Sequence, residues 1–209
     1  MKVIEIFRSL QGEGVLIGTP TVFIRLQGCN LHCEWCDAGY ARDGGKEISV
    51  EQVLQKVDDL KTQFVCLTGG EPLLQKESIK LMNKLLEKLY HVTLETNGSL
   101  SLEDVPCAEN MLISMDIKCP SSGMQEKMLF DNIELLSPAD QIKFIVADND
   151  DLKYAENIIK TYEIKCSVIF TPVGGLALEP VAGFVLSRKI NARVLPQLHK
   201  LIWGETKGV

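Results

Sequence analysis

Residues 21–40 read TVFIRLQGCNLHCEWCDAGY, an apolar run that leads into three closely spaced cysteines. The segment 21–27 is nearly continuous in its apolar character, which is typical of a strand buried on both faces of a parallel sheet. Cys29, Cys33 and Cys36 follow with the spacing C-x3-C-x2-C, and no fourth cysteine is nearby. The stretch therefore predicts a strand that carries a three-thiol site at its carboxyl end.

The rest of the chain alternates between strand-like and helix-like segments. Helical apolar spacing follows a capping-box residue at Ser49, follows Ser78 as far as Leu89, and follows an Asp/Asn-rich cap at 148–150. A fourth helix is expected over 177–189. Besides 21–27, the predicted strands are 64–68, 92–96, 111–117, 141–147, 166–171 and 192–198.

This pattern predicts an incomplete TIM-like barrel, that is, a partial β/α barrel of the α/β class. A full eight-stranded barrel usually takes ~250 residues, whereas this chain has 209, which we expect to form one domain, residues 1–209. Polar, glycine-rich segments follow the strands that end near residues 27, 68, 96 and 117. Because sites in such folds lie beyond the carboxyl ends of the strands, these segments should meet at one mouth.

Composition narrows the function classes. The chain has 22 Lys and Arg against 28 Asp and Glu, a net charge of −6, and no basic stripe, so we expect no nucleic-acid partner. No apolar run approaches the ~20 residues that span a bilayer, so we expect no membrane partner. Glu5 interrupts the alternating N-terminal segment, which is unlike a signal peptide. A cytoplasmic location follows.

A reducing cytosol disfavours disulfides. Four scattered cysteines are therefore predicted to be small core residues, and these are Cys66, Cys107, Cys119 and Cys166. The clustered trio indicates metal instead. A closed zinc site is one alternative, but structural zinc prefers four tight ligands and no second cysteine pair is present, although His32 lies inside the trio. An iron–sulfur cube fits better, because three thiolates bind three irons and leave the fourth open for an exogenous ligand.

The trio, with Trp35 just before its last cysteine, resembles the signature of radical S-adenosylmethionine enzymes. The resemblance implies a truncated radical S-adenosylmethionine core with a [4Fe-4S] cluster, whose open iron chelates S-adenosylmethionine and whose electron generates a 5′-deoxyadenosyl radical. Gly69-Gly70-Glu71-Pro72 resembles the GGEP motif that binds the methionine amino group. Glycine lets backbone carbonyl groups approach an ammonium closely.

Further stretches resemble the 7-carboxy-7-deazaguanine synthase family over nearly the whole chain, namely IFRSLQGEG (6–14), ETNG (95–98), SMDIKCPSSG (114–123) and QLHKLIWG (197–204). The resemblance implies a lyase that converts 6-carboxy-5,6,7,8-tetrahydropterin to 7-carboxy-7-deazaguanine with loss of ammonia, on the route to queuosine or archaeosine. Two alternatives stay open. One is an activase that installs a glycyl radical on a partner protein, and the other is a non-catalytic iron–sulfur or zinc module.

The resemblance also assigns substrate-binding residues. Arg25, a charge in an apolar strand, needs an anionic partner, either the substrate carboxylate or a structural ion pair. The segment 10–13 is either the pterin-facing turn or an ordinary loop, and Thr68 is either a substrate contact or a simple strand residue. The predicted substrate-binding residues are Leu10, Gln11, Gly12, Glu13, Arg25, Thr68 and Val209.

The resemblance likewise assigns the S-adenosylmethionine contacts. Ser114 and Asp116 would face the ribose hydroxyls, whereas Glu95 and Asn97 have a similar position without an assigned role. His199 and Lys200 are not assigned to the site, because a lone histidine is more often structural. The predicted cofactor-binding residues are Trp35, Asp37, Gly70, Glu71, Ser114, Met115 and Asp116, with Cys29, Cys33 and Cys36 as metal ligands.

One position departs from the family pattern. The family usually has a threonine or serine, linked to Mg²⁺, two residues after the last cysteine, and here that position is Ala38. A methyl group cannot ligate a hard cation. Either Mg²⁺ is held by Asp37, substrate and water, or the enzyme works without it, and we expect a weakened magnesium requirement. The resemblance further implies an electron donor such as flavodoxin or ferredoxin, and a homodimer.

Overall fold

The structure, a computed structural model, describes residues 1–206 and 208. Its centre is one nine-stranded open sheet with the strand order β3-β1-β2-β4-β5-β6-β7-β8-β9. The strands are β1 (Lys2–Leu10), β2 (Pro20–Leu26), β3 (Lys46–Glu47), β4 (Phe64–Gly69), β5 (His91–Thr96), β6 (Met111–Lys118), β7 (Gln141–Val146), β8 (Ser167–Pro172) and β9 (Arg193–Val194). From β2 to β9 neighbouring strands are parallel, whereas β1 pairs antiparallel with both β2 and β3.

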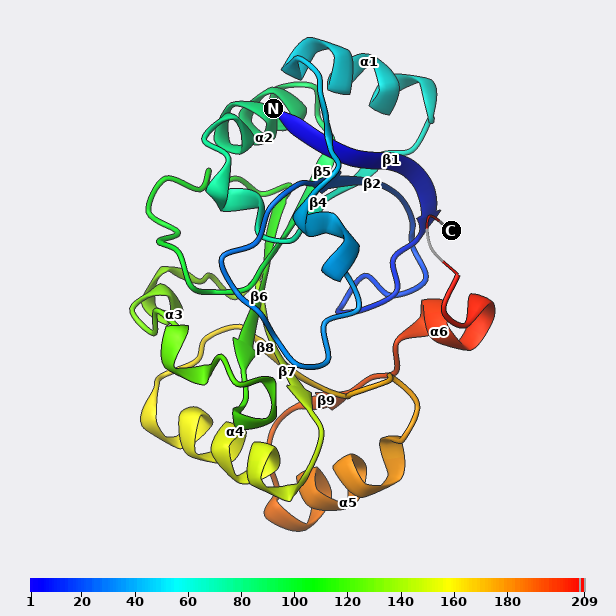
Figure 1. The fold of residues 1–209 in the computed structure, drawn as a ribbon. Helices are drawn as coiled ribbons and strands as arrows, with labels where there is room; N and C mark the ends of the chain where they lie inside the picture. Colours follow the sequence, from blue (N-terminus) through cyan, green and yellow to red (C-terminus); the bar gives the residue numbers. More distant parts are fainter. Residues whose placement is uncertain (207, 209) are drawn as a thin grey trace.

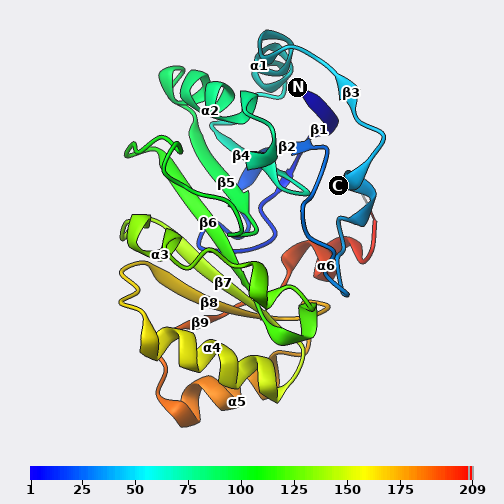
Figure 2. The same cartoon turned by 60° about the vertical axis from the view of Figure 1, so that its left-hand side comes forward.

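The sheet curves without closing, and its helices lie on the outer side (Figure 1). The helices are α1 (Val50–Asp59), α2 (Glu77–Glu87), α3 (Asn132–Leu135), α4 (Asn149–Thr161), α5 (Leu178–Arg188) and α6 (Leu198–Trp203). Figure 2 shows α1 and α2 beside β4 and β5, and α4 and α5 below β7 and β8. The segment between β2 and β3 and the short α6 lie on the inner side instead. The incomplete barrel is therefore confirmed.

Local sequence signals explain where several helices begin. At α1, Gln52 N–H donates to Ser49 Oγ at 3.2 Å and Ser49 N–H donates to Gln52 Oε1 at 2.8 Å, which is the expected capping box. The Asp148 side chain caps α4 by accepting from the Asp150 and Asp151 N–H groups. The predicted helix after Ser78 is displaced, because α2 already begins at Glu77 and Ser78 is buried within it.

Three other predictions were wrong in detail. The prediction that Leu89 belongs to a core face fails, because this residue has a left-handed φ of 63° beyond α2 and is 81% exposed. The predicted strand 192–198 forms only Arg193–Val194, since Pro196 cannot donate to a ladder and α6 begins two residues later. Cys107, predicted to be a core residue, is exposed, whereas Cys66 and Cys119 are fully buried.

The core fills the space between the sheet and the outer helices. Fully buried side chains of β2, β4 and β5, namely Ile24, Leu67 and Leu94, share one hydrophobic cluster with Leu81 and Leu85 of α2. Phe144 of β7 stacks on Phe170 of β8 with ring centroids 5.3 Å apart. With its outer face covered, the sheet leaves its polar side chains on the inner side. In the part of the chain that the structure describes, no helix is long and apolar enough to cross a membrane.

Candidate active site

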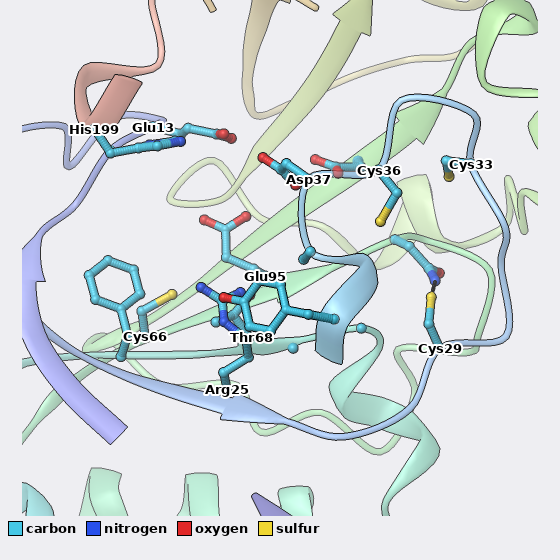
Figure 3. A pocket seen from close by; sticks show the side chains of 18 of the residues that line it. Glu13, Arg25, Cys29, Cys33, Cys36, Asp37, Cys66, Thr68, Glu95 and His199 are labelled. Carbon is cyan, nitrogen blue, oxygen red and sulfur yellow. Dashed lines mark hydrogen bonds between the residues drawn. The ribbon is translucent and has the colours of Figure 1, made fainter. Parts of the chain in front are cut away.

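A cavity of about 300 Å³ opens on the inner side of the sheet. Its walls come from the end of β1, from β2, from the carboxyl ends of β4 to β7, from the cysteine-bearing loop and from α6. Figure 3 shows the loop that bears Cys29, Cys33 and Cys36 on one side of this cavity and Glu13 and His199 on the opposite side. Arg25, Thr68 and Glu95 lie between them. The motifs separated along the sequence do meet at one mouth.

The three predicted metal ligands all line the cavity. Each is a free cysteine, as are the other four of the chain. The Leu31 N–H donates to Cys29 Sγ at 3.4 Å, and Asn97 Nδ2 lies 3.8 Å from the same sulfur (Figure 3). Three thiols on one loop, with N–H donors already aimed at a sulfur, fit an iron–sulfur cluster, because such hydrogen bonds stabilise sulfur ligands and tune the cluster's potential.

A second, smaller cavity of about 110 Å³ lies beside the cysteine loop and is lined by Trp35 and Asp37. The Trp35 indole Nε1 donates to Ser121 Oγ at 3.0 Å, and the Ser121 hydroxyl donates in turn to Asp151 Oδ2 at 2.5 Å. Asp151 is fully buried and also accepts the Ala147 N–H at 2.7 Å. Trp35 is therefore tied to α4 through two polar contacts.

The GGEP segment follows β4 and supports the cysteine loop from beneath. A Cβ added at Gly70 would lie 2.2 Å from the Gly28 carbonyl oxygen and 2.6 Å from Cys29 Cβ, so only glycine fits there. Glu71, predicted to bind cofactor, is fully buried and accepts the Leu73 and Asn97 N–H groups at 3.0 and 2.7 Å. Burial raises the pKa of Glu71 above its ordinary value although these hydrogen bonds favour the carboxylate. Its carboxylate thus organises the backbone around the site.

The predicted pterin-facing turn, residues 10–13, lines the cavity opposite the cysteines. The Leu198 N–H donates to the Gly12 carbonyl at 2.9 Å, and the His199 ring lies so close that a Cβ at Gly12 would be 2.2 Å from its Nδ1. Glu13 accepts from Gln197 Nε2 at 2.6 Å. The C-terminal segment therefore packs directly on this turn, and His199 and Lys200 both line the cavity.

Arg25 lines the same cavity and already has an acidic neighbour. Its Nε donates to Glu5 Oε1 at 2.7 Å, and Tyr40 donates to the same oxygen at 2.8 Å. The structural ion pair considered from the sequence is thus present. It occupies the Nε edge of a group that has five N–H donors, so it is compatible with a further anionic ligand. Thr68 lies beside Arg25 on β4, in register with it, and also lines the cavity.

A buried charge network forms the floor between the two sides. Lys143 Nζ lies 2.6 Å from Glu13 Oε2, 2.8 Å from Glu95 Oε2 and 3.3 Å from Asp116 Oδ1. The last contact is an ion pair without hydrogen-bond geometry. The other oxygen of Asp116, Oδ2, accepts a hydrogen bond of 2.7 Å from Lys118 Nζ.

The pKa values of this network diverge. Burial opposes ionisation of Glu13 and Asp116, but the neighbouring ammonium groups outweigh it and hold the pKa of both carboxyls below its ordinary value. Burial raises the pKa of Glu95 in spite of Lys143. Burial alone would lower the pKa of Lys143, yet the three carboxylates raise it well above its usual range. Glu95 is therefore the member that protonates most readily.

Some predicted site residues lie behind the cavity wall. Ser114 is fully buried, where its hydroxyl donates to Glu95 Oε2 at 2.8 Å and accepts from Gln141 Nε2 at 2.7 Å. Met115 is buried beneath Gly98. Neither residue lines the cavity, whereas Asp116 does. Val209 lies outside the described residues.

Sequence reasoning missed Lys143 and Lys118. Lys143 is a charge in the middle of the apolar run 141–147, the same signal that singled out Arg25 in 21–27. A buried charge requires a partner, so the run already indicated that acidic groups should meet β7. Gln197 and Glu5 carried no comparable signal, because their roles depend on segments that are distant in the sequence.

Comparisons with known proteins identify the family of this chain. The model of the radical SAM superfamily matches residues 23–112. A 7-carboxy-7-deazaguanine synthase of Methanospirillum hungatei is 44% identical over 97% of this chain and 85% of its own length, and that of Thermoplasma acidophilum is 37% identical over both full lengths. The fold resembles the crystal structure of QueE from Escherichia coli, with a TM-score of 0.76, 24% identity and 92% of each chain covered. The chain therefore belongs to the 7-carboxy-7-deazaguanine synthase family, within the radical S-adenosylmethionine superfamily.

Proposed function

We propose that this chain is a lyase that converts 6-carboxy-5,6,7,8-tetrahydropterin to 7-carboxy-7-deazaguanine with loss of ammonia. The relatives from Methanospirillum hungatei and Thermoplasma acidophilum are named 7-carboxy-7-deazaguanine synthase, and the matches cover 85% and 100% of their lengths. The observation that carries the proposal is that Cys29, Cys33 and Cys36 line the same cavity as Arg25 and Glu13. One cavity thus offers thiolates for a cluster, a guanidinium for a carboxylate and a carboxylate for the guanidine-like edge of a pterin.

The bound cluster and S-adenosylmethionine would supply the radical that takes a hydrogen atom from the substrate. The chain's own residues bind and orient. Arg25 would face the substrate carboxylate, since its Nε is already fixed by Glu5. Glu13, held ionised by Lys143, would accept from the amino and ring N–H groups of the pterin. Thr68 and the backbone of 10–12 would complete the substrate contacts, and Gly70 and Asp116 would face S-adenosylmethionine.

The residues at the expected magnesium position do not fit a hard cation. The Ala38 side chain lines the cavity where a hydroxyl would be needed, which leaves Asp37 as the neighbouring oxygen donor. We therefore propose a weakened magnesium requirement. A magnesium titration of turnover should give at most a small increase, and a strong, tight activation would overturn this part of the proposal.

The remaining proposals concern the setting of the reaction. An electron donor such as flavodoxin or ferredoxin would reduce the cluster, and the chain would act as a homodimer in the cytoplasm. Size-exclusion chromatography with light scattering would test the dimer, and a monomeric mass would exclude it.

An anaerobic assay tests the reaction itself. The cluster is reconstituted, dithionite, S-adenosylmethionine and 6-carboxy-5,6,7,8-tetrahydropterin are added, and products are identified by mass spectrometry. We expect 7-carboxy-7-deazaguanine with little net loss of S-adenosylmethionine. Formation of 5′-deoxyadenosine without that product would reject the substrate but keep the radical chemistry, and an intact cluster with neither signal would reject both.

A further inference from the structure

We propose that Lys143 is a positioning residue that serves both ligands at once, holding Glu13 for the pterin and Asp116 for S-adenosylmethionine. The proposal rests on the proposed function, because it assigns those two carboxylates to the two ligands. Glu13 follows β1 and Asp116 belongs to β6, so nothing in the local sequence links them. The ammonium of Lys143 contacts both.

The placement of Lys143 leaves its ammonium little freedom. The residue belongs to β7, in register with Asp116 of β6, and its side chain is only 5% exposed. Its shortest contact, 2.6 Å, reaches Glu13 across a separation of 130 residues. Glu95 takes a third position at 2.8 Å, and its other donor is the Ser114 hydroxyl. One buried cation therefore contacts carboxylates that come from three different segments of the chain.

The charge balance explains why removing the Lys143 ammonium should change ligand binding. Removing it would leave three buried carboxylates facing one another, and breaking a buried ion pair costs far more than the pair itself contributes. Glu13 and Asp116 would then separate or take up protons, and either change would remove an acceptor from its ligand. The effect should appear in the affinity for both ligands.

Lys118 provides a matched control. It is also a buried lysine, 10% exposed at its side chain, and its ammonium contacts Asp116 Oδ2 at 2.7 Å. Among the described residues it forms an ion pair with Asp116 alone, and its ammonium also lies 5.5 Å from the centroid of the Trp35 ring. Lys118 therefore supports the S-adenosylmethionine side without reaching Glu13.

The experiment measures equilibrium dissociation constants on anaerobic protein with a reconstituted, unreduced cluster, so that no turnover occurs. The probes are S-adenosylmethionine and 6-carboxy-5,6,7,8-tetrahydropterin. Lys143→Met should weaken pterin binding by about tenfold or more, the factor that corresponds to the loss of one charge-assisted hydrogen bond. It should weaken S-adenosylmethionine binding by about threefold or more, because the contact with Asp116 is an ion pair without hydrogen-bond geometry. Lys118→Met should weaken S-adenosylmethionine and leave pterin binding within about twofold. A Lys143→Met protein that loses affinity for one ligand only would overturn the proposal.

Double-mutant cycles separate positioning from a general structural role. If Lys143 acts through Glu13, adding Lys143→Met to Glu13→Gln should change pterin affinity by less than about twofold. The same should hold for S-adenosylmethionine in the Asp116→Asn background. Effects that multiply in either cycle would overturn the proposal. Should Lys143→Met fail to fold, Lys143→Met with Glu95→Gln removes one charge of each sign and is measured in its place.

The binding measurements on wild-type protein and the double-mutant cycles also distinguish a failure of this proposal from a failure of the proposed function. Wild-type protein that binds S-adenosylmethionine but not the pterin would overturn the substrate assignment, and the role of Lys143 toward that substrate with it. Wild-type protein that binds both ligands, with multiplicative cycles, would overturn the role of Lys143 and leave the reaction standing.

Discussion

Glu5 receives two donors at one oxygen, the Nε of Arg25 at 2.7 Å and the hydroxyl of Tyr40 at 2.8 Å. The guanidinium carbon of Arg25 also lies 5.5 Å from the centroid of the Tyr40 ring. One carboxylate on β1 and one ring after the cysteines thus fix the orientation of the arginine on β2. Among the described residues, no further hydrogen bond or ion pair engages this guanidinium, so its remaining N–H groups are available for an anion in the cavity.

Arg25→Lys should raise the KM for the pterin substrate. A lysine keeps the charge but loses the planar fork, so kcat/KM should fall by about 10- to 100-fold, in line with the loss of a bidentate charge-assisted contact. Steady-state kinetics would measure this. Glu5→Gln keeps an oxygen acceptor for the Arg25 Nε, so kcat/KM should fall by less in this variant than in Arg25→Lys. An unchanged KM in Arg25→Lys would show that the arginine serves Glu5 alone.

Gly70→Ala should disrupt the cysteine loop. The new Cβ would lie 2.2 Å from the Gly28 carbonyl oxygen and 2.6 Å from Cys29 Cβ. Neither atom is the end of a flexible side chain, so neither can move aside without a shift of the backbone. Because the clash would displace Cys29, a predicted cluster ligand, we expect the iron content after reconstitution to fall by roughly half or more. Gly183→Ala is the control, because nothing lies within 4 Å of that Cβ in α5. It should stabilise the protein by about 0.5–1 kcal/mol. Full iron loading of Gly70→Ala would contradict the steric argument.

Ser121→Ala should destabilise the protein more than Trp35→Phe does. The serine variant deprives the buried Asp151 of a hydroxyl donor and also removes the acceptor of the indole. Leaving a buried charged acceptor short of a donor costs about 1–3 kcal/mol, whereas Trp35→Phe removes one hydrogen bond of about 1 kcal/mol. Urea unfolding of each variant measures the difference, and the reverse order would refute it.

The hydrogen bond from the Tyr90 hydroxyl to Asp58 Oδ1, 2.6 Å long, should make stability depend on pH at both extremes. Burial and the carboxylate raise the pKa of Tyr90 to about 12, and the same hydrogen bond lowers the pKa of Asp58. For a raised tyrosine pKa, the stabilisation is complete below pH ~10 and is lost as the pH rises toward 12. For a lowered aspartate pKa, it is complete above pH ~4 and is lost as the pH falls.

Tyr90→Phe should therefore flatten the pH dependence of the urea midpoint at both ends. Tyr154→Phe is the comparison, because burial raises the pKa of Tyr154 to about 12 with neighbouring acidic groups as lesser causes, and its phenol donates to no aspartate among the described contacts. That variant should flatten the alkaline limb alone. An unchanged acidic limb in Tyr90→Phe would show that Asp58 draws its low pKa from Lys88 instead.

The parallel strands β2 and β4 to β8 could be predicted from the sequence because each is a short run of mostly apolar and buried residues. β1 was not among the predicted strands. Its residues alternate, it pairs antiparallel with β2 near one edge of the sheet, and most of its residues are only half-buried. The segment around Pro196 shows the opposite failure. Its apolar residues satisfy a strand pattern, yet the proline removes a backbone donor, and the chain turns into α6 at Leu198.

The site divides in the same way. Local motifs identified Cys29, Cys33 and Cys36, which share one loop, and the segment 10–13. Pairings across the fold, such as Glu5 with Arg25 or Lys143 with Glu13, depend on strand order and register. A single sequence contains the charges but not the order in which the strands assemble.

The contact of Gln197 with Glu13 spans 184 residues, and the Leu198 N–H donates to the Gly12 carbonyl beside it. During synthesis on the ribosome, the cysteine loop and its supporting strands therefore emerge long before the segment that covers the opposite wall. Contacts between such distant segments cannot form before both segments have been synthesised, so this wall of the cavity is completed only after Gln197 and Leu198 emerge. A nascent chain would thus expose its thiols to an iron–sulfur donor through a wider opening, which narrows when the segment around Gln197 and Leu198 docks on residues 12 and 13.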